Sequence, residues 1–212
     1  MLVIRDTLPG GPSDGKLAPG DVITAVNGEL VTDFVTLDAL LDDRVGEDIE
    51  VEVQRGGQTQ KFALTVGDLH AITPDQFLEV GGAVLNPLSY QLARQSQIPV
   101  QGVAIANSGY VFGNGGINRH AVITDIDGEA VPDLDAMEAR LSAIPDGASF
   151  SVGYFYINEP NSRLVGTLYM DRKWFPTRRC VRKDQTGTWD CRSSPAADRD
   201  VAGNNVAHTE PL

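Results

Sequence analysis

The chain has 212 residues and a formal net charge of -12, from 17 Lys and Arg against 29 Asp and Glu. This length suits one large domain or two domains of about 100 residues each. The acidic balance argues against nucleic-acid binding, because phosphate contacts need clustered basic residues. Short apolar runs and a start without a signal-peptide pattern predict no membrane span and leave the compartment unknown.

The sequence repeats itself at an offset of one hundred residues. Residues 22–31 read VITAVNGELV and residues 122–131 read VITDIDGEAV, so both copies share the pattern V-I-T-x-[VI]-x-G-E-x-V. Asp33 and Asp133 follow at the same offset. Two homologous domains are the simplest explanation of this repeat.

Each copy predicts the same elements in the same order. The V-I-T segment is a short strand rich in β-branched residues, and the Asn27-Gly28 or Asp127-Gly128 pair that follows is a strong hairpin-turn signal. Asp33 or Asp133 then stands where a helix N-cap would, before apolar residues at helical spacing. Two strands complete each copy, at residues 49–55 and 61–66, and at 150–157 and 163–170.

The two copies differ at their front. Residues 2–4 fall opposite residues 103–105, and the segment 71–101 of the second copy has no counterpart before Leu2. We therefore expect the first copy to be incomplete at its N-terminus. The chain is then a fragment of a longer protein, or a gene product that lost its front.

Several segments resemble a known family. Residues 8–31, LPGGPSDGKLAPGDVITAVNGELV, resemble a PDZ domain of the HtrA type, with its small-residue turn, L-x-P-G-D-V-I, strand and N-G; this resemblance spans residues 2–67. Four further segments resemble one HtrA/Deg-like branch, with fungal nuclear and plant members, that joins two protease–PDZ halves in one chain. They are VGDLHAITPDQF at 66–77, LSYQLAR at 88–94, MDRKWFP at 170–176 and KDQTGTWD at 183–190.

The resemblance implies the tandem PDZ region of a serine protease in protein quality control. The fold class that follows is mainly β with short helices (α+β). We expect an N-terminally incomplete PDZ domain of the HtrA type over residues 1–68 and a second PDZ-like domain over 71–172. A β-hairpin extension would follow over 173–192, and a disordered linker or tail over 193–212, where the composition is polar.

A PDZ domain binds an extended C-terminal peptide by adding it as a strand to a sheet edge. The resemblance places the carboxylate-binding loop of the second copy at Val80, Gly81, Gly82 and Ala83, where two glycines let several N–H groups point at one anion. Residues 83–85, including Leu85, would form the edge strand. The helix would then direct its apolar side chains into the peptide pocket, namely those of Met137 and Leu141.

Other interpretations of the second copy remain open at this point. The two glycines could form only a turn, and Met137 and Leu141 could be core residues. The copy would then be a structural spacer or docking module that holds protease domains together, or part of a free-standing PDZ adaptor. Because the first copy lacks the early loop and edge strand, we expect it not to bind a peptide in the family manner.

Catalytic and metal-binding patterns are weak. Ser108, in Asn107-Ser108-Gly109, lacks the flanking glycines of a trypsin-like serine motif and is more simply a loop serine. The histidines show no triad spacing. Acidic runs such as Asp42-Asp43 lack the ligand order of a calcium loop. We therefore predict no catalytic residue, metal or cofactor on this chain, and as partners peptide or protein C-termini and protease domains.

The two cysteines flank a turn at residues 184–187. A four-residue loop would place Cys180 directly across from Cys191, close enough for a disulfide, and Trp189 across from Arg182, as a cation–π pair. A three-residue loop would break this pairing, and a reducing compartment would keep both thiols free.

Basic residues gather in the same region, at positions 172, 173, 178, 179, 182 and 183. This basic stripe either docks against an acidic face of the first copy or of a protease domain, or is a solvated strand face.

Overall fold

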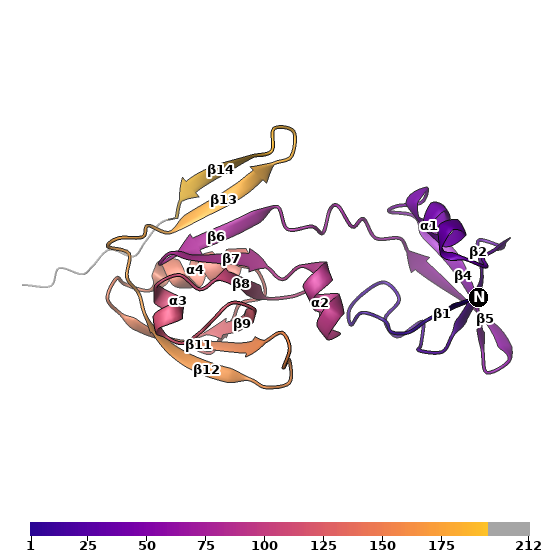
Figure 1. Cartoon of the computed structure of the whole chain (residues 1–212), viewed down its shortest axis with the longest axis horizontal. Helices are drawn as coiled ribbons and strands as arrows, with labels where there is room; N and C mark the ends of the chain where they lie inside the picture. Colours follow the sequence, from indigo (N-terminus) through magenta and orange to yellow (C-terminus); the bar gives the residue numbers. More distant parts are fainter. Residues whose placement is uncertain (195–212) are drawn as a thin grey trace, which may run out of the picture.

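The computed structural model describes residues 1–194, which form two β-sheets, each with its own core (Figure 1). The predicted fold class is confirmed, since strands dominate and the helices are short. The first domain comprises β1 (Leu2–Val3), β2 (Val22–Val26), β3 (Glu29–Leu30), α1 (Phe34–Asp42), β4 (Asp48–Arg55) and β5 (Gln58–Thr65).

The second domain is larger and carries three of the helices within residues 1–194. Its elements are β6 (Gln76–Val80), β7 (Ala83–Pro87), α2 (Tyr90–Ser96), β8 (Val103–Asn107), α3 (Val111–Asn114), β9 (Ala121–Ile126), β10 (Glu129–Ala130), α4 (Leu134–Ala143), β11 (Ser149–Tyr156), β12 (Leu164–Tyr169), β13 (Arg178–Lys183) and β14 (Thr188–Ser193). The strands follow the order β12-β11-β9-β8-β7-β6-β13-β14, and β10 pairs with β9.

Local signals in the repeat form the same structures in both domains. Asn27-Gly28 and Asp127-Gly128 close turns with positive φ at all four residues. The carboxylate of Asp33 accepts a hydrogen bond from the N–H of Thr36, and that of Asp133 accepts one from Ala136. These side chains satisfy N–H groups that the first turn of a helix leaves free.

The domains differ beside the repeated strands. In the second, β8 lies between β7 and β9, whereas its counterpart β1 pairs only with β2 among the residues that the structure describes. The C-terminal hairpin, predicted as an extension over residues 173–192, begins at Arg178 and is part of the second sheet. The tail was predicted over residues 193–212. Its first residue, Ser193, is the last residue of β14, and residues 195–212 lie outside the described residues.

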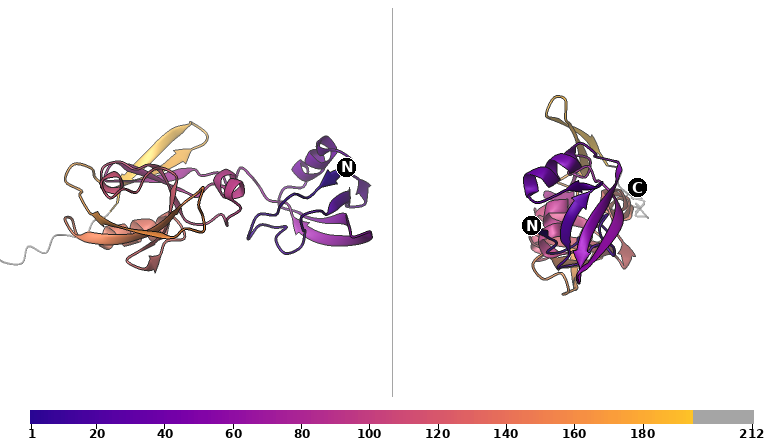
Figure 2. Two further views of the ribbon diagram at one scale, coloured as in Figure 1. Left: turned by 60° about the horizontal axis from the view of Figure 1, so that its bottom comes forward. Right: turned by 90° about the vertical axis from the view of Figure 1, so that its right-hand side faces the viewer.

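The two domains follow one another along the long axis of the molecule, and residues 66–75 connect them (Figure 2). Leu8 of the first domain packs against a small apolar cluster of the second that includes Leu88, Ala93 and Val122. Within residues 1–194, no helix is long and apolar enough to span a membrane.

An ion pair with a buried carboxylate stabilises the first domain. Asp21 is 1% exposed, and its oxygens accept hydrogen bonds at 2.7 and 2.6 Å from Nε and Nη2 of Arg55 and at 2.8 Å from the N–H of Ala18. The Arg55 guanidinium, assisted by the Ala18 N–H, holds the pKa of Asp21 below its ordinary value against the opposing effect of burial. Strand β4 is thereby tied to the turn before β2.

We expect Asp21→Asn to cost about 2 kcal/mol, because it leaves Arg55 without its anion. Since folding lowers the pKa of Asp21, the pair stabilises the domain above the unfolded-state pKa of about 4. This stabilisation disappears as the pH falls through the lower folded-state pKa. Hydrogen exchange of β2 amides at several pH values measures the loss of stability in the variant and its dependence on pH. Glu50→Gln, at the exposed pair with Lys61, is the control, and an equal effect of both variants would contradict the prediction.

Candidate functional site

The predicted carboxylate loop is a tight turn between β6 and β7. Gly81 and Gly82 have φ values of +55° and +76°, and Val80 pairs with Ala83 across the turn. The carbonyl of Gly81 accepts hydrogen bonds from the N–H groups of Tyr110 and Val111, at 2.8 and 3.3 Å. A Cβ at Gly81 would collide with the side chain of Val111. The glycines therefore permit the turn to pack closely against the start of α3.

The prediction that residues 83–85 form an edge strand is wrong, because β7 lies between β6 and β8. Residues 76–80 form a further strand outside it. All the apolar side chains predicted for the peptide site lie in the core cluster of the second domain, namely Val80, Ala83, Leu85, Met137 and Leu141. Met137 and Leu141 occupy the side of α4 that faces the sheet, so the structure places them beneath the surface of any groove on it.

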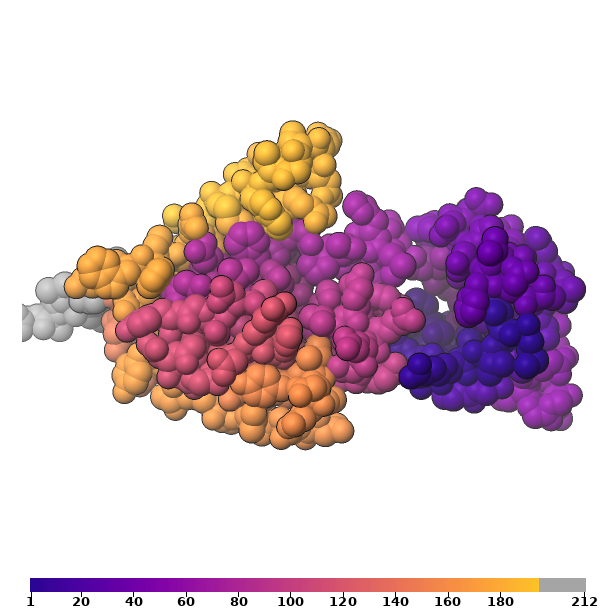
Figure 3. Space-filling model, viewed as in Figure 1, coloured from indigo at the N-terminus to yellow at the C-terminus, as the bar shows by residue number. Residues whose placement is uncertain are grey.

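The strand beyond β7 is β6, and its outer side pairs with β13. The pairing is antiparallel, from Arg178 opposite Glu79 to Val181 opposite Gln76, and continues as the N–H of Arg182 donates to the carbonyl of Asp75 at 2.7 Å. The hairpin lies along β6 on the surface of the domain (Figure 3). We give the name β6–α4 groove to the space between the outer side of β6 and residues Asp135 and Glu138 of α4, which the Arg179 side chain of β13 enters.

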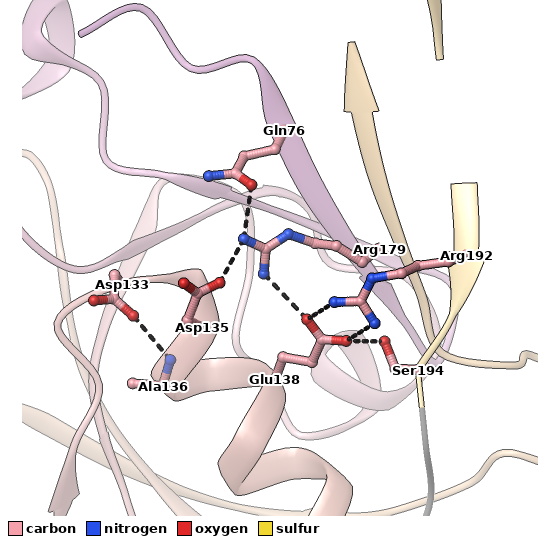
Figure 4. A network of polar contacts seen from close by, with 8 residues as sticks. All are labelled: Gln76, Asp133, Asp135, Ala136, Glu138, Arg179, Arg192 and Ser194. Atoms are coloured by element: carbon pink, nitrogen blue, oxygen red, sulfur yellow. Dashed lines mark hydrogen bonds and ion pairs between the residues drawn. The ribbon is translucent and has the colours of Figure 1, made fainter. Parts of the chain in front are cut away.

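One arginine of β13 joins both walls of this groove (Figure 4). Arg179 is 4% exposed. Its Nη2 donates to Oε1 of Gln76 at 2.8 Å and to Oδ1 of Asp135 at 2.9 Å, and its Nη1 donates to Oε2 of Glu138 at 3.3 Å. Glu138 also binds Arg192 at 3.0 and 3.1 Å and accepts a hydrogen bond from the hydroxyl of Ser194. The buried carboxylate of Glu138 thus holds both strands of the hairpin.

The opposite face of the hairpin carries different contacts. Arg178 pairs with Glu79, and the ring of Trp189 lies edge-on to that of Phe77, with the centroids 4.9 Å apart. The predicted register is found, with Cys180 opposite Cys191 and Arg182 opposite Trp189. The predicted cation–π pair is wrong, because Trp189 packs on Phe77 while Arg182 binds the carboxylate of Asp184 at 2.6 Å.

A disulfide joins Cys180 and Cys191 in the structure. We therefore expect thiol titration of the unreduced, unfolded chain to find no free thiol, and titration after reduction to find two. Reduction should weaken the hairpin by about 2–3 kcal/mol, because it restores freedom to a short loop of the unfolded chain. Hydrogen exchange of β13 and β14 amides reports this loss, and the double variant Cys180→Ser, Cys191→Ser serves as a control that no oxidant can re-bridge. Two thiols before reduction would overturn the pairing.

The basic stripe is largely neutralised within the second domain. Arg178, Arg179 and Arg182 pair with the carboxylates named above, and Lys183 pairs with Asp190 at 2.9 Å. Arg172 donates from Nη1 to the carbonyl of Ile144 at 2.8 Å and from Nη2 to that of Leu141, at the end of α4. Burial lowers the pKa of Arg172. Arg172, Arg178 and Arg179 attach the C-terminal segment to the rest of its domain, whereas Arg182 and Lys183 form ion pairs within the hairpin.

Ser108, the weak nucleophile candidate, lies in the loop after β8, where Asn107 Oδ1 accepts a hydrogen bond from the N–H of Gly109 at 3.0 Å. This is a local side-chain turn, the common role of asparagine in loops. Among residues 1–194, no three His, Cys, Asp or Glu side chains come together as a metal site.

A small sheet whose outer strand lies beside a helix and pairs with a further strand is the arrangement by which a PDZ domain takes up a peptide. Family models agree with this assignment: residues 2–66 match the PDZ domain and residues 71–147 the PDZ-like domain. The chain therefore belongs to the PDZ-domain proteins and carries two such domains in tandem.

Its relatives are serine proteases. The chain is 39% identical over 209 residues to Protease Do-like 7 of Arabidopsis thaliana. The aligned residues make up 97% of this chain and 19% of that protein. It is 44% identical over 191 residues to the pro-apoptotic serine protease nma111 of Aspergillus clavatus, covering 90% and 19%. With the NMA111 of Yarrowia lipolytica, identity is 41% over 194 residues, covering 90% and 20%. The chain spans about a fifth of the length of these relatives, and the predicted kinship with such proteases is confirmed.

Proposed function

We propose that this chain is the noncatalytic PDZ region of an HtrA-like serine protease in protein quality control. It recognises protein C-termini or extended peptides by strand addition. The observation that carries the proposal is the antiparallel pairing of β13 with β6 beside α4. Strand addition there uses backbone hydrogen bonds for affinity and side-chain contacts with the helix for selectivity.

The second candidate is a spacer or docking module that holds protease domains together. The observation that favours it is the occupancy of β6 by β13, reinforced by the Glu138 contacts and the disulfide. In this case β13 is a permanent strand of the domain, and β14 is the edge strand of the sheet.

Binding of labelled peptides to the full chain distinguishes the two. The peptides end in Val, Leu, Ile, Phe or Ala, and each is compared with the same peptide amidated at its C-terminus. NMR shifts of the β6 amides of the protein report where each peptide binds. If the β6 amides shift and the β5 amides do not, and the shifts disappear when the peptide is amidated, the chain recognises C-termini. Shifts that survive amidation support recognition of extended internal segments. No binding by any peptide would leave the spacer as the function.

A further inference from the structure

We infer that the β6–α4 groove selects an extended segment with an arginine at the position of Arg179, and that β13 is its resident ligand. This inference rests on the proposed strand addition at β6 and names the class of ligand: internal strands with an arginine facing α4. Three side-chain oxygens, from Gln76, Asp135 and Glu138, converge on the guanidinium of Arg179.

The acidic wall of the groove explains the need for an arginine. Glu138 is 9% exposed, and a carboxylate buried to this degree is costly unless cations pair with it. Arg192 of β14 supplies one cation and Arg179 of β13 the other, and of the two only Arg179 also reaches Gln76 and Asp135. The acceptors lie on two elements, β6 and α4, so the cation must reach both. A planar guanidinium has several donors in a fixed fork and can do this, whereas the point charge of a lysine ammonium matches such a set poorly.

The backbone pairing shows that the ligand need not end in a carboxylate. β13 continues past β6 in both directions, from Pro176 and Thr177 into the strand and out of it into the turn at residues 184–187. At the end of the groove the carbonyl of Asp75 accepts a hydrogen bond from Arg182. A backbone acceptor there suits the N–H of a continuing chain and does not suit a carboxylate, which can only accept.

The resident strand is not an ideal ligand. Among the described residues, Nε of Arg179 is buried without a hydrogen-bond partner. An unsatisfied buried donor reduces the net gain of the contact. A segment that presents its arginine with a better fit could therefore compete with β13 for β6.

The test uses full-length chains and a labelled peptide with the sequence of residues 176–183 and Cys180→Ser. Arg179→Ala in the protein removes the resident arginine and leaves the groove walls intact. Arg178→Ala is the matched control, because it removes the neighbouring arginine, which pairs with Glu79 on the opposite face of β13. A second peptide carries Arg179→Ala.

We expect the Arg179→Ala chain to bind the arginine peptide at least tenfold more tightly than the wild-type and Arg178→Ala chains do. It should prefer this peptide at least tenfold over the peptide without the arginine. Adding Glu138→Gln to Arg179→Ala should remove that preference. NMR shifts of β6 amides confirm the location, and if Arg179→Ala fails to fold, the double variant Cys180→Ser, Cys191→Ser takes its place.

The inference and the proposed function fail in different ways. Equal binding of both peptides at β6 would overturn the arginine selectivity and leave strand addition intact. Absence of binding, together with β6 amides that stay protected from exchange in the Arg179→Ala chain, would overturn both and show that β13 is a permanent structural strand.

Discussion

Gly109→Ala is expected to destabilise the second domain by about 4 kcal/mol or more, among the largest effects of a single substitution. Gly109 has a φ of +53°, and a Cβ there would collide with backbone atoms of Gly82 and Ala83. These atoms belong to the β6–β7 turn, which is held by the hydrogen bonds of its Gly81 carbonyl to α3. Backbone in a docked turn cannot move aside as a flexible side chain would.

Gly116→Ala is the matched control. Gly116 has a similar φ of +75° but no atom within 4 Å of the position of an added Cβ. Alanine there should cost only the strain of the left-handed conformation, about 1 kcal/mol. Urea unfolding followed by tryptophan fluorescence measures the stability of both variants. The signal reports on the second domain, because both tryptophans of the chain, Trp174 and Trp189, belong to it. Similar losses in the two variants would show that the turn adapts and that the close approach is unimportant.

Glu138→Ala is expected to cost about 3 kcal/mol, because it removes the buried one of the two α4 carboxylates that bind the guanidinium of Arg179 and also frees Arg192 and Ser194. Those three side chains belong to the C-terminal hairpin and its end. We therefore expect the hairpin to open before the rest of the domain unfolds. Exchange of β13 and β14 amides should become much faster, while that of β9 and β11 amides changes little.

The control for Glu138 is Glu129→Ala. Glu129 of β10 pairs with Arg140 of α4 at 2.9 Å, but both side chains are exposed. Such surface pairs contribute about 0–1 kcal/mol, so the hairpin should remain as protected as in the wild type. If Glu138→Ala also leaves the hairpin protected, the hairpin is held by its backbone pairing and the disulfide, and the carboxylate is unimportant.

These two predictions concern the parts of the second domain that define the candidate site. The Gly109 contact holds the turn that aligns β6, and the Glu138 contact holds the strand that lies on β6. Opening the hairpin alone would expose a strand edge beside a helix, which is the arrangement that a peptide ligand requires. The stability of the hairpin relative to the domain therefore controls access to the proposed site.

Much of the repeated unit was predictable because its signals are local. Asn27-Gly28 and Asp127-Gly128 favour a hairpin turn through their own tolerance of positive φ, and Asp33 and Asp133 cap helices through N–H groups three residues away. The cysteine register depended on whether one turn has four residues or three, and the structure has four. Such features depend on residues close in sequence, so the pattern alone indicates them.

The error at residues 80–85 also has a local cause. The segment FLEV-GG-AVL consists of two apolar runs separated by two glycines, a hairpin signal. The family resemblance instead assigns those glycines to a carboxylate loop and implies no strand at residues 76–80. Reading the segment as a hairpin would have identified β6 as the outer strand of the pair.

The residue pattern was sufficient to predict the PDZ kinship and the two-domain repeat with its turns and caps, and it left the cysteine pairing dependent on the length of one turn. The folded arrangement was needed to show that β13 covers β6 and that Glu138 on α4 binds two arginines. Arg179 meets Gln76 across 103 residues and Glu138 across 41. Basic residues in a strand have the same local pattern whether they face solvent or an acidic wall. The choice depends on which distant carboxylates the folded sheet and helix bring within hydrogen-bonding distance.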